Sequence, residues 1–318
     1  MLVWILFLAA IFVFLALDLG VFNKTPHVIS SKEAGKWTAI WVAMSFAFSG
    51  IIFWLYQSGY ISNPDHLKPS GAVVKYITGY LIELSLSIDN IFIIAIIFSA
   101  FRIPQKYQHR VLFWGIIGAV LFRGLMIYFG VLLVNRFHWI TYIFGLFLIF
   151  TAIRMLIKDN DENFDPKHSL PYRIISKIIP TTHHMDGQRF FRVMENGRKR
   201  ATPLFVALLV IEMMDVVFAA DSVPAILAIT SDPFLVFSSN IFAILGLRSM
   251  YFFLANMIRK FVYVEYSLIA ILTFVGIKML ITDWVEFQEW VSLAFIAVSL
   301  GIGILTSLNK VGDQTNGQ

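Results

Sequence analysis

Nine long apolar segments constrain the fold of this 318-residue chain more than any other feature of its sequence. A helix needs about 20 mostly apolar residues to cross the hydrocarbon core of a bilayer. Only 14% of the residues are charged and 58% are hydrophobic, against about 25% and about 45–50% in soluble domains. The predicted spans are 2–22, 37–59, 72–100, 111–134, 138–157, 202–230, 234–258, 263–282 and 289–307. The sequence therefore predicts an all-α polytopic membrane protein with about nine transmembrane helices.

The basic residues of the loops predict how these helices are oriented. Lysines and arginines concentrate in the loops after the odd-numbered helices, whereas the even-numbered loops hold only Lys68 and Arg136. Because basic loops stay in the cytoplasm, the N-terminus is expected outside and the C-terminus inside. No basic residue precedes the first apolar segment, so we interpret it as a retained helix and not as a cleaved signal peptide.

The chain also repeats itself. Glu83 and Asp89 recur as Asp215 and Asp221, with five residues between the two acids in each copy. The third helix of each copy carries a related motif, "IRMLIKD" and then "IKMLITD". Each copy has three helices, so the copies cross the membrane in opposite senses and form an inverted-topology repeat, as in many secondary transporters. The predicted parts are a two-helix segment (1–71), the repeats (72–157 and 202–283), a cytoplasmic loop (158–201), and a C-terminal helix and tail (284–318).

Acidic side chains inside the spans are the strongest functional signal, because each costs at least about 2.5–3.5 kcal/mol at the bilayer centre. They are Asp18, Glu83, Asp89, Glu212, Asp215 and Asp221, and the arginines that can balance them are Arg123 and Arg248. Two arginines cannot neutralise six carboxylates. The remaining acids must be protonated, face water or bind cations.

The types of side chain near these acids indicate which ion they suit. Asn90 and Ser222 add oxygen donors beside the two repeated aspartates, whereas the chain has no cysteine and its histidines lie in loops or near helix ends. Oxygen-rich sites suit Mn²⁺, Mg²⁺ or Ca²⁺ and not zinc or copper. Met213 and Met214 either pack the core or add a thioether, which would favour manganese over calcium.

Helix geometry leaves two alternatives for the first acidic pair. Glu83 and Asp89 lie about 120° apart on an ideal helix, so either they serve different partners or the helix is unwound between them. In the second copy, Pro224 follows Asp221 by three residues and is expected to open that turn. In the loop 158–201, Asn196-Gly197 predicts a small β-hairpin, and the basic residues suit anionic headgroups.

Four motifs resemble the TerC family of integral membrane proteins, which includes the Alx-type proteins: "ELSLSIDN", "EMMDVVFAADSVPAI", "SNIFAILGLRSMYF" and "GIKMLI". They occur in the family's order along nearly the whole chain. The resemblance implies a protein of the bacterial inner membrane, linked to tellurite-resistance loci and to manganese export. It also implies that the acids of the two repeat motifs bind the ion.

Three classes of function fit these features: a secondary cation transporter, a membrane aspartyl protease and a membrane-protein assembly factor. The protease lacks its usual Gly-x-Gly-Asp context and would leave four acids unexplained. No nucleotide-binding motif is present, so export must use a gradient. We therefore expect a transporter and not an enzyme. Its expected partners are the lipid bilayer, Mn²⁺ as substrate and protons in exchange, with no tightly bound cofactor and no nucleic acid; an assembly factor is the alternative.

Overall fold

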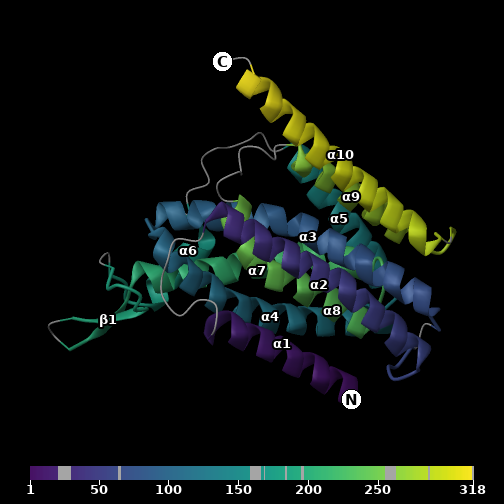
Figure 1. Cartoon of the computed structure of the whole chain (residues 1–318), viewed down its shortest axis with the longest axis horizontal. Coiled ribbons are helices and arrows are strands. Elements are labelled where there is room, and N and C mark those ends of the chain that lie inside the picture. Colours follow the sequence, from purple (N-terminus) through teal and green to yellow (C-terminus); the bar gives the residue numbers. More distant parts are fainter. Residues whose placement is uncertain are drawn as a thin grey trace.

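A computed structural model of the chain describes residues 1–20, 30–63, 66–157, 166–167, 169–182, 185–194, 197–254, 263–285 and 287–316, with the side chains of 17–20 and 308–316 left aside. The helices in these ranges are α1 (Leu2–Gly20), α2 (Ser31–Gln57), α3 (Pro69–Ala100), α4 (Gln105–Arg136), α5 (Trp139–Ile157), α6 (Leu170–Ile178), α7 (Pro203–Leu227), α8 (Pro233–Leu254), α9 (Val264–Leu280) and α10 (Glu289–Asn316). The strands are β1 (Phe191–Val193) and β2 (Lys199–Ala201). Figure 1 shows most helices running along one common direction.

Each predicted span overlaps one helix, and α6 is additional. Within the described residues, seven helices are long and apolar enough to cross a membrane: α2, α3, α4, α5, α7, α8 and α10. The helix α9 has 17 residues, and α1 is apolar from Leu2 to Ala16. The chain is therefore a helical, multi-pass membrane protein.

Several helices extend beyond their predicted apolar runs. The helix α2 begins at Ser31, where the Ser30 hydroxyl accepts a hydrogen bond from the Glu33 amide at 3.2 Å. The helix α4 begins at Gln105, and α10 continues to Asn316. The hydrophobic pattern predicts only the part of a helix that crosses the hydrocarbon. The helix itself can be longer, because its backbone hydrogen bonds can continue into the polar residues on either side.

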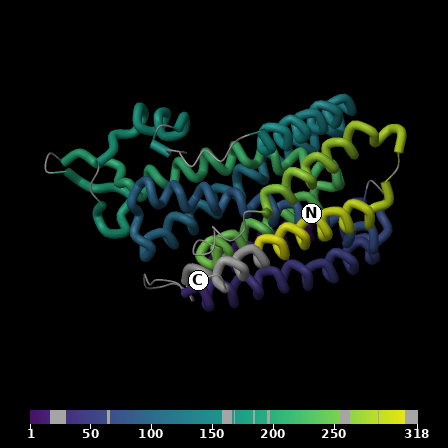
Figure 2. Tube along the Cα trace, turned by 90° about the horizontal axis from the view of Figure 1, so that it is seen from above, coloured from purple at the N-terminus to yellow at the C-terminus, as the bar shows by residue number. Residues whose placement is uncertain are grey.

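The helix α8 forms the centre of the bundle, since it is buried along almost its whole length. It packs against α2, α3 and α4, and Phe7 of α1 packs against Phe234 at a ring-centroid distance of 5.4 Å. The helix α4 packs against α7, and α5 against α9, an arrangement that can be followed in Figure 2. A Cβ atom added at Gly276 would lie only 2.9 Å from the carbonyl oxygen of Gly145. Small residues therefore bring α5 and α9 into close contact.

Both helices that carry the repeated acids are continuous. The expectation that Pro224 opens a turn is wrong, because α7 continues through Pro224 to Leu227. Only three residues of α7 follow the proline, so the helix ends near it without unwinding at Asp221. The helix α3 is likewise unbroken from Pro69 to Ala100. Glu83 and Asp89 thus lie on different sides of one regular helix and meet different partners.

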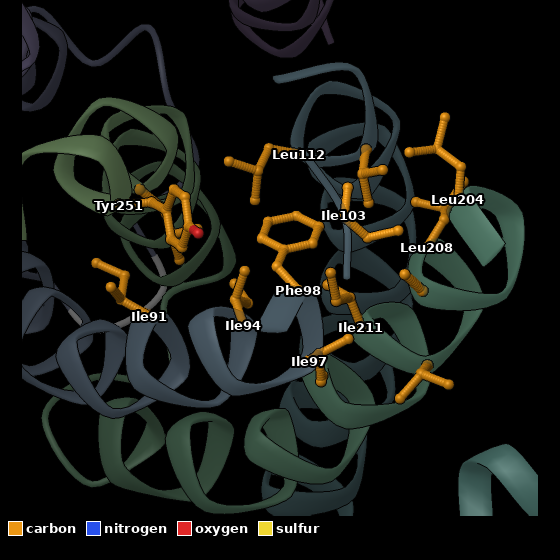
Figure 3. Close-up of a cluster of buried hydrophobic side chains, with 14 of the residues drawn as sticks. Ile91, Ile94, Ile97, Phe98, Ile103, Leu112, Leu204, Leu208, Ile211 and Tyr251 are labelled. Atoms are coloured by element: carbon orange, nitrogen blue, oxygen red, sulfur yellow. The ribbon is translucent and has the colours of Figure 1, made fainter. Parts of the chain in front are cut away.

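The loop 158–201 contains the predicted hairpin and one unpredicted helix. Strands β1 and β2 pair antiparallel, with Arg192 opposite Arg200, and Gly197 adopts a φ of +74° in the turn. Asn196, the other residue of the predicted turn, lies outside the described residues. The hairpin and α6 lie at the same end of the bundle in Figure 1. There a cluster that includes Phe98, Leu204 and Tyr251 fills the space between the helix ends (Figure 3).

Candidate functional site

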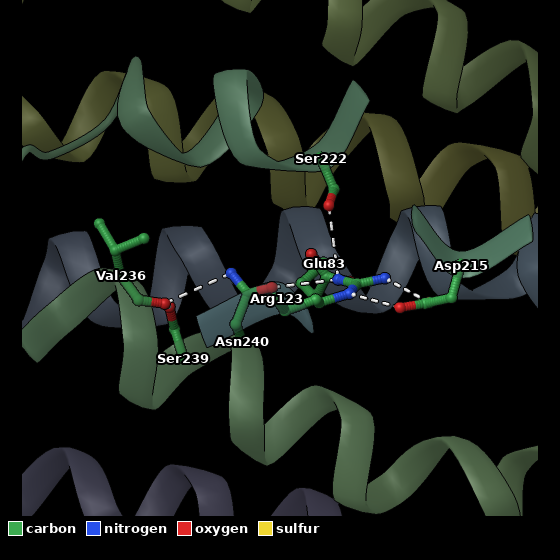
Figure 4. Close-up of polar contacts among 7 residues, drawn as sticks. All are labelled: Glu83, Arg123, Asp215, Ser222, Val236, Ser239 and Asn240. Carbon is green, nitrogen blue, oxygen red and sulfur yellow. Dashed lines mark hydrogen bonds and ion pairs between the residues drawn. The ribbon is translucent and has the colours of Figure 1, made fainter. Parts of the chain in front are cut away.

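Arg123 is the centre of a buried polar cluster that joins four helices (Figure 4). Its side chain is fully buried, and Glu83 on α3 is 1% exposed. One terminal nitrogen, Nη1, forms an ion pair with Glu83 Oε1 and donates to Asn240 Oδ1 on α8 at 3.0 Å. The other, Nη2, donates to Asp215 Oδ1 on α7 at 3.0 Å. One guanidinium thus faces two carboxylates, so the fully ionised cluster carries one net negative charge.

Two further contacts fix the orientation of this guanidinium. Its Nε donates to the second oxygen of Asp215 at 3.4 Å, so Asp215 is held at both oxygens. The Ser222 hydroxyl oxygen lies 3.4 Å from Nη1 and accepts from it. The planar guanidinium group carries several N–H donors in fixed directions and can therefore bind several acceptors at once. A lysine ammonium group could not replace it in this arrangement. The acids Glu83 and Asp215, which are equivalent in the two repeats, therefore meet at one arginine.

Asn240 is the member of the cluster that the charge pattern did not indicate. It is fully buried in the middle of α8, and its amide nitrogen donates to the Val236 carbonyl at 3.3 Å. This leaves its carbonyl oxygen directed at Arg123. The sequence does contain a sign of its importance, because an amide inside an otherwise apolar span is costly. That cost is smaller than the cost of a charge, so the sign is weaker.

A small cavity of about 40 Å³ lies next to this cluster. Asn90, Glu212, Met214 and Asp215 line it together with apolar side chains of α3, α4, α7 and α8. Glu212 Oε2 and Asn90 Nδ2 are buried there, and neither has a hydrogen-bond partner among the described residues. The rest of the lining is mainly apolar. Because unpaired buried polar groups are costly, an occupant that pairs with these two atoms would be stabilised there.

One glycine of α4, Gly118, makes room for Glu212. Its carboxylate lies so close to Gly118 that a Cβ atom added there would collide with both carboxylate oxygens. At Gly115, an added Cβ would make only an ordinary contact, 3.9 Å from Glu212 Oε1. The missing side chain of Gly118 thus leaves the space on α4 that the Glu212 carboxylate occupies beside the cavity.

Substituting Gly118 with alanine should displace Glu212, because the added methyl occupies the position of the carboxylate, and under the transport function proposed below it should lower transport strongly. Gly50→Ala is the matched control, since an added Cβ there meets nothing within 4 Å. Both variants should insert into membranes in similar amounts. The rate of Mn²⁺ uptake by vesicles that contain equal amounts of each variant measures the effect. Equal rates for Gly118→Ala and Gly50→Ala would contradict a role for the position of Glu212.

The second acids of the two repeats lie elsewhere. Asp89 is within electrostatic range of Glu265 on α9. Asp221 accepts a hydrogen bond from the Thr151 hydroxyl on α5 at 3.0 Å, and Arg154 lies near it. The arrangement is reciprocal, because each acid faces the third helix of the other repeat. In the described part of the chain, no three Asp, Glu or His side chains gather as a group that could hold a metal ion.

Two other predicted residues have different outcomes. Arg248 on α8 is buried and donates to His109 Nε2 on α4 at 2.9 Å, a contact that the sequence did not indicate. Asp18 falls in the last turns of α1, and its side chain lies outside the described residues.

Comparison with known proteins gives a consistent family assignment. The profile described as "Integral membrane protein TerC family" matches residues 69–315. An uncharacterized membrane protein of Myxococcus xanthus is 49% identical, over 96% of this chain and 92% of its own length. A protein of Escherichia coli strain K12 named "Putative membrane-bound redox modulator Alx" is 41% identical, over 96% and 92%. No solved structure matches. Since the profile covers most of the chain and the relatives nearly all of it, this chain is a member of the TerC family of integral membrane proteins.

Proposed function

We propose that this protein is a secondary transporter that exports a divalent cation, manganese, from the cytoplasm in exchange for protons. The observation that carries this proposal is the cavity beside the Arg123 cluster. Glu212, Asn90 and Asp215 line it, and within the described part of the chain Glu212 Oε2 is buried without a hydrogen-bond partner. Carboxylate and amide oxygens are the ligands that hard divalent cations prefer.

The packing supports the proposed inverted repeat of three helices each. The first helix of each repeat packs against the second helix of the other, as α3 does with α8 and α7 with α4. The third helices, α5 and α9, pack against each other. Pairs exchanged in this way are what a pseudo-two-fold axis in the membrane plane produces. The full proposal has nine spans, including α1 and α9.

The proposed topology places the cavity toward the cytoplasm. Its lining includes Ile97, near the end of α3, and Leu112, near the start of α4. The short connection between these helices carries Arg102, and α4 begins with Lys106 in its first turn. Basic residues at this end indicate the cytoplasmic side. A cation could therefore enter the cavity from the cytoplasm and reach Glu212 and Asp215.

Cysteine labelling should give opposite results at the two ends of the bundle. The chain has no native cysteine, so Ser62→Cys and Ser176→Cys each create one thiol at an exposed position. In intact cells a membrane-impermeant thiol reagent should label position 62 and leave position 176 unlabelled. In lysed cells it should label both. Labelling of position 176 alone in intact cells would overturn the proposed orientation of the whole bundle.

Exchange of manganese for protons should be measurable with purified protein in sealed vesicles. Metal and protons compete for the same carboxylates, so an imposed pH gradient should drive Mn²⁺ uphill, and addition of Mn²⁺ should move protons the other way. Downhill flux that is indifferent to the pH gradient would exclude proton exchange. Absence of any flux above that of protein-free vesicles would remove the transport proposal and favour an assembly factor.

The name of the Escherichia coli relative raises a second candidate, a redox role. Thiol–disulfide exchange requires cysteine, and this chain has none. The buried features of the structure are carboxylates, amides and hydroxyls around one arginine. These groups suit cation binding, and we therefore favour ion transport for this chain.

A further inference from the structure

The short helix α6 exposes an apolar stripe although it lies outside the predicted membrane spans. Leu170, Ile174 and Ile178 are 70%, 46% and 73% exposed. Residues four apart on a helix are offset by only about 40° around its axis, so the three side chains form one line along the helix. A Ser169 cap, whose hydroxyl accepts from the Tyr172 amide at 3.4 Å, fixes where this helix starts.

The opposite side of α6 attaches it to the ends of the membrane helices. Ile175 is 4% exposed and belongs to the cluster that contains Phe98 of α3 and Leu204 of α7. The Tyr172 ring lies 5.7 Å from the ring of Phe101, directly after α3. Leu204 is in the first turn of α7, which begins at Pro203. The helix α6 therefore lies at the level where α3 and α7 leave the bilayer.

The charged residues of α6 flank the stripe on one side. Arg173 and Lys177 are both exposed, and no acidic side chain in the described part of the chain forms an ion pair with either. Ser176 lies on the far side of the helix from Ile174, by about 160°. Long basic side chains at the border of an apolar face are typical of helices that lie in a membrane interface, where they reach the headgroups.

We propose that α6 lies in the plane of the cytoplasmic leaflet. The stripe of Leu170, Ile174 and Ile178 enters the boundary of the acyl chains, and Arg173 and Lys177 contact anionic phosphate headgroups. The bilayer is the occupant that this position requires, because α6 is attached to helix ends that emerge from it. The inference depends on the cytoplasmic placement of 158–201 and not on which ion the protein transports.

Single fluorescent labels can test this placement, since the native chain has no cysteine. Ile174→Cys and Ser176→Cys, each carrying an environment-sensitive NBD group, are reconstituted into vesicles of phosphatidylcholine alone or mixed with phosphatidylglycerol. The label at 174 should shift to shorter wavelength and be quenched by lipids that carry a quencher in the acyl chain. The label at 176 should remain accessible to aqueous iodide.

Charge variants test the role of the headgroups. Arg173→Gln with Lys177→Gln should raise the phosphatidylglycerol content needed for the shift at 174, corresponding to about a 30-fold loss of affinity for the anionic surface. Lys199→Gln with Arg200→Gln removes the same charge from strand β2 and should leave the shift unchanged. Circular dichroism and elution volume verify folding of both variants.

Two outcomes would overturn the proposal. Equal exposure of the labels at 174 and 176 to iodide in every vesicle would show that the stripe faces water. Protection of position 174 that rises with the protein-to-lipid ratio, and is indifferent to lipid charge, would assign the stripe to contact with a second copy of the chain.

Discussion

Replacing Arg123 with alanine should lower the free energy of unfolding by about 3–5 kcal/mol, the cost of removing one partner from a buried ion pair. Arg123 is fully buried, and Glu83 is 1% exposed. Without the guanidinium, Glu83 and Asp215 lose their common cation, and Asn240 Oδ1 loses its donor. Two uncompensated carboxylates inside a bundle repel each other, and Glu83 is too deeply buried for water to solvate it.

Matched variants distinguish the loss of the buried ion pairs of Arg123 from the general effect of removing an arginine. Arg136→Ala removes an exposed arginine from the end of the same helix and should change stability by no more than about 0.5 kcal/mol. Arg123→Lys keeps the positive charge but loses the planar set of N–H donors. Its loss of stability should therefore lie between those of Arg136→Ala and Arg123→Ala. Thermal unfolding in detergent measures all three.

A triple variant gives the sharper test of the electrostatic argument. Adding Glu83→Gln and Asp215→Asn to Arg123→Ala should recover part of the lost stability, because the uncompensated charges disappear. If the single Arg123→Ala variant is as stable as Arg136→Ala, the cluster contributes nothing to folding. If the triple variant is less stable than the single one, repulsion between the acids is not the cause of the loss.

The membrane helices could be predicted because bilayer thickness sets their length. Their ends could not, since α4 begins six residues before its predicted span, in a polar stretch that the hydrophobic pattern does not mark. The helix α6 was missed for a related reason. It has nine residues, so its apolar stripe comprises only three side chains, too few to distinguish from the rest of a polar loop.

The acids of the site could be predicted from their cost in hydrocarbon, but their grouping could not. Glu83 and Asp89 differ in partner because α3 presents them to different neighbours, and those neighbours depend on how α4, α7 and α9 pack. Asn240 carries no charge, and Gly115 occupies the corresponding position of the first copy when the copies are aligned on their arginines. A search for repeated charges therefore passes over it.

Asp89 and Asp221 are the pair for which the transport proposal makes its most demanding prediction. They occupy equivalent places in the two repeats, and each faces the third helix of the other repeat, near Glu265 and Thr151 respectively. Their positions suit acids that hold the cation at a different stage of transport from Glu212 and Asp215. Since the repeats have opposite orientations, the two acids should serve opposite halves of the pathway.

Asp89→Asn and Asp221→Asn should each lower manganese export by at least about 10–100-fold, the range for losing a group that supports a metal ligand, while the protein still inserts. Asparagine keeps the size and polarity of aspartate but loses the charge that attracts a divalent cation. The control is Asp283→Asn, because Asp283 follows α9, where Tyr142 and His138 hydrogen-bond it and hold its pKa below the ordinary value. That variant should export at the rate of the unmodified protein. Vesicle uptake of Mn²⁺ at matched protein content measures all three, and export by Asp89→Asn or Asp221→Asn at the rate of the control would show that these acids do not handle the ion.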